Sequence, residues 1–135
     1  MAGGGVALVK AAAEVSKLRA KDNQSHEQKL GYEIVLKALE APARAIAENA
    51  GQEAGAVIVE RIKTGKGWLG YDALRGLMRP DMIADGIVDP VKVTRLGVEN
   101  ACSAAAILLT TEAAIADLPE DKKENHSQAG ADFGY

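Results

Sequence analysis

Two aspartates stand at positions where a carboxylate could help to bind a ligand. Asp72 lies in a Gly-Tyr-Asp-Ala turn, and Asp89 lies directly before Pro90. The Asp72 carboxylate can accept a hydrogen bond from the amino group of an adenine, or it can fold back on the backbone of its own turn, which the residues alone favour. Asp89 can accept hydrogen bonds from two ribose hydroxyls or cap the helix that follows, and these two roles are compatible.

A run of three glycines precedes the first expected helix. Gly3, Gly4 and Gly5 can expose backbone amides at a helix N-terminus, where the helix dipole favours an anion such as a phosphate. A flexible start or a tight turn is the commoner role of such a run. No Gly-Lys-Ser/Thr follows, so the run is not a P-loop; the Thr-Gly-Lys-Gly sequence at 64–67 lacks strand-loop-helix spacing and is a turn.

The sequence predicts neither a catalytic set nor a metal site. No pair of carboxylates is spaced around a candidate nucleophile, and no Ser/His/Asp or Cys/His arrangement is present. Asp81, Asp85 and Asp89 are four residues apart, but Gly86 interrupts any helix that would stack them. The single Cys102 has no Cys or His at metal-ligand spacing, and its Ala and Ser neighbours predict a small buried residue.

Apolar spacing predicts the helices that must position these residues. We expect Val57, Ile58 and Ile62 to lie on one side of the third helix. Pro42 should kink or briefly break the second helix, because it has no amide hydrogen to donate. The expected helices span residues 6–19, 25–50, 53–63 and a longest one from the Asp89-Pro90 start to about 112.

The remaining segments are expected to be short or irregular. We expect residues 68–71 to form one arm of a small hairpin and residues 80–85 to form a single helical stretch. Residues 113–118 are expected to form a strand. Small residues at 97, 101, 104 and 105 give the longest helix a face that a neighbour can approach closely. The polar, aperiodic segment 120–135 is expected to be a flexible tail, which leaves one domain over residues 1–119.

Composition limits the class of protein. The 135 residues suffice for one modest domain, and with only 4% aromatic residues the core must be built from Ala, Val, Ile and Leu, which favours helices. The net charge of −3 comes without a basic cluster, which argues against nucleic-acid binding. No leader or membrane-length apolar run is visible, so we expect no membrane association and a reducing cytoplasm.

A collinear series of motifs resembles the C-terminal part of the equatorial domain of group I chaperonins, the 60-kDa chaperonin family. Each motif is weak, but their order is specific and covers nearly all of residues 3–119. The series comprises Gly-Gly-Gly-Val-Ala-Leu at 3–8, Glu-Ala-Pro at 40–42, Gly-Tyr-Asp-Ala at 70–73, Met-Ile-Ala-Asp-Gly-Ile-Val-Asp-Pro at 82–90, Lys-Val-Thr-Arg at 92–95, Thr-Thr-Glu at 110–112 and Asp-Leu-Pro at 117–119.

The resemblance implies a mainly α fold, an antiparallel helical bundle with a small β-hairpin and a C-terminal strand. It implies an ATP-dependent chaperonin that assists protein folding in a double ring, with this chain contributing adenosine-binding and ring-contact surfaces. The strand at 113–118 would pair with a neighbouring subunit's hairpin. The implied nucleotide-binding residues are Gly3 and Gly4 along the nucleotide, Asp72, Ala73 and Leu74 at the adenine, and Ile87 and Asp89 at the base and ribose.

The chain also departs from the family pattern. Members are several times longer, so the phosphate loop, the magnesium-binding acidic motif and the water-activating aspartate are expected outside this chain, as is the domain that binds co-chaperonin and unfolded proteins. The segment containing Leu74, Arg75 and Pro80 is one residue longer than usual, and the tail lacks Gly-Met repeats. The alternative function is a stand-alone helical assembly module that has lost nucleotide binding.

Overall fold

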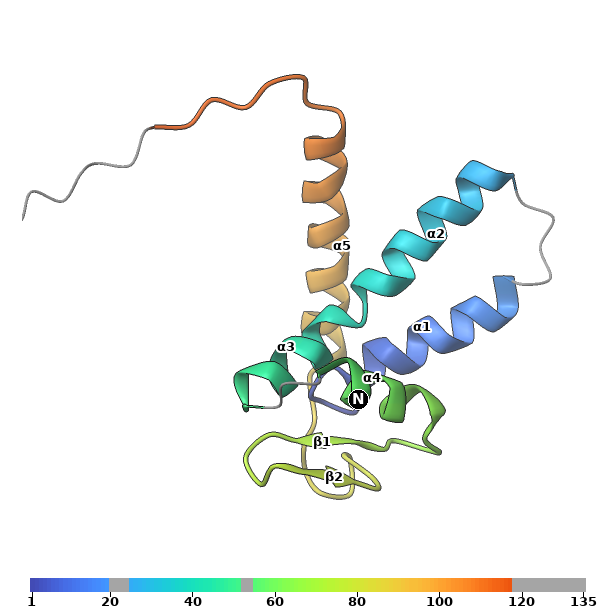
Figure 1. The fold of residues 1–135 in the computed structure, drawn as a ribbon, viewed down its shortest axis with the longest axis vertical. Coiled ribbons are helices and arrows are strands. Elements are labelled where there is room, and N and C mark those ends of the chain that lie inside the picture. Colours follow the sequence, from blue (N-terminus) through green and yellow to red (C-terminus); the bar gives the residue numbers. More distant parts are fainter. Residues whose placement is uncertain (20–24, 52–54, 118–135) are drawn as a thin grey trace, which may run out of the picture.

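The computed structural model describes residues 1–19, 25–51 and 55–117. The described part is mainly helical with one two-stranded antiparallel sheet, as predicted (Figure 1). In chain order the elements are α1 (Val6–Arg19), α2 (His26–Ala38), α3 (Ala41–Asn49), α4 (Gly55–Thr64), β1 (Gly70–Asp72), β2 (Leu77–Arg79) and α5 (Val91–Leu109).

Helices α1 and α2 lie side by side and run in opposite directions (Figure 1). A reciprocal capping box starts α2: the Ser25 hydroxyl accepts from the Gln28 amide at 3.3 Å, and the Gln28 side chain accepts from the Ser25 amide at 3.1 Å. The Arg19 guanidinium lies 4.2 Å from the ring centroid of Tyr32, a cation–π contact that joins the two helices.

The predicted break at Pro42 is confirmed. Helix α2 ends at Ala38, and the amide of Glu40 donates to the carbonyl of Lys37 in a tighter turn. Helix α3 then begins at Ala41, so Pro42 occupies its first turn, where a missing amide hydrogen costs nothing. Glu40 also ties α3 to α4, because its Oε1 lies 2.6 Å from Lys63 Nζ.

The core is small and lies where α1, α3 and α4 meet the hairpin. Its largest fully buried side chains are those of Ile62, Met82, Val6, Val9 and Val59. The Val57 side chain is 49% exposed, whereas Val59 packs inward with Ile58 and Ile62.

Glycine is required where α1 begins against α3. Gly5 has a φ of +76°, and a Cβ at this position would lie 2.7 Å from the backbone nitrogen of Ala43. Any larger residue would therefore carry backbone strain and a collision with a neighbouring backbone. The glycine lets the N-terminal turn and α3 approach closely.

The hairpin pairs Gly70 with Arg79 and Asp72 with Leu77. The helical stretch predicted over 80–85 was wrong, because residues 82–86 form hydrogen-bonded turns. Asp81 Oδ1 accepts from the amides of Ile83 and Ala84 at 2.9 and 3.2 Å, and Gly86 then adopts a φ of +76°. That left-handed conformation ends the turn before a helix can continue.

Helix α5 differs from expectation at both ends and in its surroundings. It begins at Val91 with Pro90 as the residue before it, and no side chain caps it, so the predicted capping role of Asp89 was wrong. It ends at Leu109 rather than near Glu112. None of its residues is buried, and Cys102 is exposed instead of buried as expected.

Residues 113–117 have no regular secondary structure, so the described part of the predicted C-terminal strand is not a strand in this single chain. A strand needs a partner backbone, and none of the described residues supplies one here. Leu118, the expected loop at 20–24 and the predicted tail lie outside the described residues. None of the described helices is both long and apolar enough to cross a membrane.

Candidate nucleotide-binding site

The first residues of the chain lie against the segment that precedes α5. The Gly3 amide donates to the carbonyl of Ile87 at 2.9 Å, and the Asp89 amide donates to the carbonyl of Met1 at 3.1 Å. Ala2 and Val88 form an antiparallel bridge between them. Gly4 and Gly5 then turn into α1 with positive φ angles, so the glycine run forms a tight turn.

A pocket of about 290 Å³, here called the base pocket, lies between this turn and the hairpin loop. It collects most of the residues singled out in the sequence. Its lining residues are Gly4, Ile46, Tyr71, Asp72, Ala73, Leu74, Arg75 and Ile87. The sequence did not predict Ile46, Tyr71 or Arg75 as pocket residues. Tyr71 and Arg75 could have been found as neighbours of Asp72, whereas Ile46 lies on α3 and reaches the pocket only through tertiary packing.

The Asp72 carboxylate is folded onto its own turn, the alternative that the residues alone favoured. Oδ1 accepts from the amides of Leu74 and Arg75 at 3.0 and 3.1 Å, and Oδ2 lies 2.8 Å from Arg75 Nη1. Asp72 is only 4% exposed. The hydrogen bond from the Arg75 side chain is the main reason that the pKa of Asp72 is lowered, so the group is ionised at neutral pH.

The outer rim of the base pocket belongs to Leu74 and Arg75. Leu74 is 91% exposed, and the Arg75 side chain is 58% exposed while it holds Asp72. A guanidinium carries only donors, so a ligand that reaches this rim meets hydrogen-bond donors rather than a free carboxylate.

A second ion pair joins β2 to the turn that precedes Ile87. Arg79 Nε and Nη2 each lie 2.6 Å from an oxygen of Asp85, a two-bond arrangement that joins β2 to the turn at 82–86. The hydrogen bond from Arg79 is the main reason that the pKa of Asp85 is lowered. The same turn carries Ile87, whose amide donates to the Met82 carbonyl at 2.8 Å. The pair therefore stabilises the segment that places Ile87 in the pocket.

Tyr71 lines the base pocket and carries a buried polar atom, its hydroxyl oxygen. The residue is 5% exposed, and its hydroxyl has no hydrogen-bond partner among the described residues. Leaving a buried hydroxyl unpaired costs free energy, so native structures rarely keep one without a reason.

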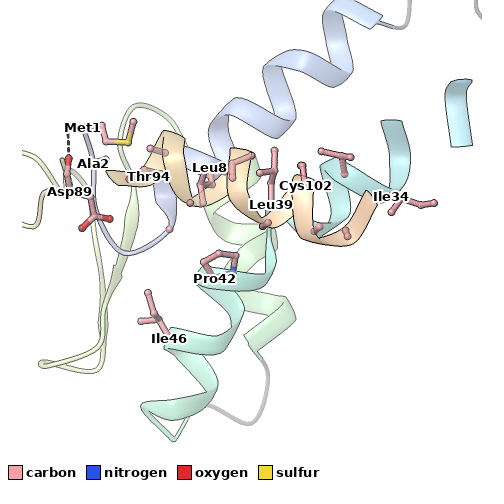
Figure 2. Close-up of a pocket in the computed structure, with 18 residues that line it drawn as sticks. Met1, Ala2, Leu8, Ile34, Leu39, Pro42, Ile46, Asp89, Thr94 and Cys102 are labelled. Carbon is pink, nitrogen blue, oxygen red and sulfur yellow. Dashed lines mark hydrogen bonds between the residues drawn. The ribbon is translucent and has the colours of Figure 1, made fainter. Parts of the chain in front are cut away.

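A larger apolar groove of about 620 Å³ lies beside the base pocket. Met1, Ala2, Gly5 and Asp89 line one end, and the helical part is lined by Ala7, Leu8, Ile34, Val35, Ala38, Leu39, Pro42, Ile46, Thr94, Gly97, Val98, Ala101, Cys102 and Ala105. Figure 2 shows Asp89 and Met1 together at one end and Ile34 far from them at the other.

Asp89 therefore borders the apolar groove and not the base pocket. Its backbone is held by Met1: the terminal amine donates to the Asp89 carbonyl at 3.1 Å (Figure 2). The carboxylate itself makes no capping bond with α5. In the N-terminal segment, Gly4 lines the base pocket, whereas Ala2 and Gly5 line the apolar groove. The segment therefore lies at the boundary between the pocket that contains Asp72 and the groove that contains Asp89.

Within the described ranges, no three His, Cys, Asp or Glu side chains are grouped so that they could hold a metal ion. The polar groups of the base pocket can recognise a ligand through hydrogen bonds. They include no arrangement of nucleophile and base.

Comparison with protein families agrees with the order of motifs along the chain. The family model described as "TCP-1/cpn60 chaperonin family" matches residues 1–119. This span includes every described element and both cavities. The chain belongs to the TCP-1/cpn60 chaperonin family.

Proposed function

We propose that this chain is part of an ATP-dependent chaperonin and that its base pocket receives the adenine of the nucleotide. Family membership supports a chaperonin role in protein folding. The observation that carries the nucleotide proposal is the convergence of Gly4, Asp72 and Ile87 on one pocket. These residues lie far apart in the sequence, and the resemblance had assigned all of them to one ligand.

The size and lining of the base pocket favour a purine over a whole nucleotide. Its volume of about 290 Å³ is at the lower limit of the roughly 300–1,000 Å³ that is typical of small-molecule sites. Ile46 and Ile87 supply apolar walls for the faces of a base, and Ala73 leaves space at the lip. Polar recognition comes from the turn that Asp72 organises.

Asp89 is proposed to meet the ribose from the groove side. It is exposed, and its backbone is held by Met1 through two hydrogen bonds, so the point from which the carboxylate projects is fixed. A carboxylate accepts hydrogen bonds from two vicinal hydroxyls. Gly4 lines the base pocket, whereas Gly3 lines neither cavity and its amide donates to the Ile87 carbonyl. Phosphate and Mg²⁺ are proposed to be held by residues outside this chain.

Assembly and location form part of the same proposal. The exposed segment 113–117, with a fully exposed Ile115, is a candidate for pairing with a neighbouring subunit in a ring. Co-chaperonin and unfolded proteins would bind through domains outside this chain. We propose that the assembly works in the cytoplasm.

Titration of the isotope-labelled full chain with adenosine, followed by amide NMR, tests the base pocket. We expect saturable shifts at Gly4, Ala73 and Ile87, with millimolar affinity because the phosphate contacts are missing. The variant Ala73→Gln should weaken the affinity about five-fold by filling the lip, roughly the equivalent of 1 kcal/mol. Ala113→Gln, the same substitution at an exposed position outside the pocket, is the matched control and should bind normally.

The alternative function, a stand-alone helical assembly module, is favoured by one observation. Helix α5 has no buried residue, and the apolar groove beside it is open. Exposed apolar surface of this kind predicts association. Sedimentation combined with the adenosine titration separates the two: association without nucleoside binding supports the module, and a monomer that binds nothing contradicts both functions.

A further inference from the structure

We propose that the hydroxyl of Tyr71 reads the base in the base pocket, by accepting a hydrogen bond from the 6-amino group of adenine. The inference rests on the proposed nucleotide site and goes beyond it, because it names the side chain that recognises the amino group. It follows from two observations on the pocket lining. Tyr71 carries a buried oxygen without a partner, and the carboxylate of the next residue, Asp72, is already occupied.

The Tyr71 hydroxyl is the buried, unpartnered polar group of this pocket. Tyr71 lies on β1 and lines the pocket, and the residue is 5% exposed. Its hydroxyl has no hydrogen-bond partner among the described residues. A hydroxyl has one hydrogen to donate and two lone pairs that accept. A hydrogen bond to a ligand would therefore recover the free energy that the unpaired hydroxyl costs.

The other two polar side chains of the lining do not offer a free acceptor. Both carboxylate oxygens of Asp72 are used within its own loop: Oδ1 accepts from the amides of Leu74 and Arg75, and Oδ2 lies 2.8 Å from Arg75 Nη1. The Arg75 guanidinium has donors only. An amino group that enters the pocket therefore finds its side-chain acceptor in Tyr71.

Adenine needs such an acceptor. Its 6-amino group donates, and the neighbouring N7 accepts. A hydroxyl oxygen can accept from the amino group while its own hydrogen remains available for N7. An amino group that is buried without an acceptor loses its hydrogen bond to water, which weakens binding. Purine riboside carries a hydrogen in place of the amino group, so it does not need the acceptor.

The loop that follows Tyr71 lies beside the hydroxyl. A Cβ at Gly76 would lie 4.0 Å from the hydroxyl oxygen, and the Gly76 amide closes the loop by donating to the Asp72 carbonyl at 2.8 Å. The Leu74 side chain in this loop is 91% exposed, so its displacement breaks few contacts. We therefore expect the rim at Leu74 to move aside when a base reaches the hydroxyl.

Tyr71→Phe removes only the hydroxyl and tests this contact. In NMR titrations of the full chain, read at the amides of Ala73 and Ile87, the adenosine affinity should fall about five-fold, as expected for one neutral hydrogen bond. The affinity for purine riboside should stay the same. Tyr32→Phe, the same substitution on α2 outside the pocket, is the matched control and should leave both affinities unchanged.

A measurement on the parent protein complements the variant. The chain contains three tyrosines, so labelling them with ¹³C at Cζ gives few signals, and Tyr71→Phe assigns the signal of Tyr71. The Cζ shift of a tyrosine responds to hydrogen bonding of its hydroxyl. The Tyr71 signal should move clearly further with adenosine than with purine riboside. This comparison decides the question should Tyr71→Phe disturb amides outside the pocket.

The outcomes separate this inference from the proposed function. A selective loss of adenosine affinity in Tyr71→Phe supports the role of the hydroxyl. An unchanged adenosine affinity, or an equal loss for both nucleosides, overturns that role while the pocket stands. Equal movement of the Tyr71 Cζ signal with the two nucleosides overturns it as well. Failure of adenosine and purine riboside to move the pocket amides overturns the nucleotide site and the inference together.

Discussion

The amide of Gly3 donates to the carbonyl of Ile87 at 2.9 Å, and this bond joins two distant parts of the chain at the base pocket. The bond places Gly4 beside the hairpin loop. It also holds Ile87 next to Val88, which forms the bridge with Ala2. The glycine turn and the segment before α5 thus act as one unit.

Gly5→Ala should destabilise the fold strongly. The new Cβ would lie 2.7 Å from the backbone nitrogen of Ala43 at a φ of +76°. Strain and overpacking together should cost about 2 kcal/mol or more in the free energy of unfolding, measured by urea denaturation. Gly67→Ala has a positive φ but nothing within 4 Å, so it isolates the strain and should cost about 1 kcal/mol. Equal costs for both variants would contradict the close packing of Gly5 on Ala43.

Tyr71→Phe should leave stability unchanged or raise it by up to about 1 kcal/mol, because the hydroxyl has no partner among the described residues. Tyr71→Ala should cost about 3–5 kcal/mol, since it deletes a buried ring. Thermal and urea unfolding measure both. A clear loss of stability in Tyr71→Phe would show that the hydroxyl is hydrogen-bonded in the folded protein.

The two aspartate–arginine pairs should make stability depend on acid pH. The folded-state pKa values of Asp72 and Asp85 are lowered by hydrogen bonds from Arg75 and Arg79, so the unfolded state binds protons more tightly. The two pairs contribute fully to the free energy of unfolding above the pKa of an unfolded aspartate, about 3.9. This contribution is lost as the pH falls through the lower pKa values of the folded state.

Urea unfolding between about pH 7 and pH 2 measures this dependence. Asp85→Asn should be less stable than the parent at neutral pH and should converge with it in acid. Glu112→Gln, at an exposed position after α5, serves as a control and should follow the parent at every pH. A constant difference between Asp85→Asn and the parent would argue against an ionic contribution from the Arg79 pair.

The isolated chain should show no magnesium-dependent ATPase activity. The described residues include no group of three or more His, Cys, Asp or Glu side chains that could hold Mg²⁺, and phosphoryl transfer depends on positioned charges around the phosphates. Phosphate release from ATP, measured with and without Mg²⁺ at high protein concentration, gives the test. Turnover that persists after repeated purification and requires Mg²⁺ would contradict the proposed division of the site.

The sequence predicted the helices best where local rules decide the structure. Apolar spacing gave α1 its observed bounds, and Pro42 marked the break between α2 and α3. Local rules failed at Asp89, where Asp-Pro suggested a cap. Its backbone is instead bonded to Met1, a contact that no local pattern encodes.

Burial and the site were harder to predict, because both depend on distant neighbours. Cys102 has the small-residue surroundings of a buried helix face, but no described helix packs closely enough to cover it. Resemblance grouped Gly4, Asp72 and Ile87 around one ligand. It could not reveal that Ile46 completes the wall, because that contact arises from tertiary packing. It also could not reveal that Arg75 occupies the Asp72 carboxylate, because residue types alone do not fix the side-chain pairing within a turn.

Photolabelling with 2-azidoadenosine, followed by mass spectrometric mapping, tests the base pocket most directly. The reactive azide sits on the base itself, so it labels the residues that surround the purine. The label should fall on residues 71–75 or on Ile87, and excess adenosine should abolish it. Labelling confined to the helical part of the apolar groove, or labelling that adenosine does not compete away, would contradict a base-binding pocket at the hairpin loop.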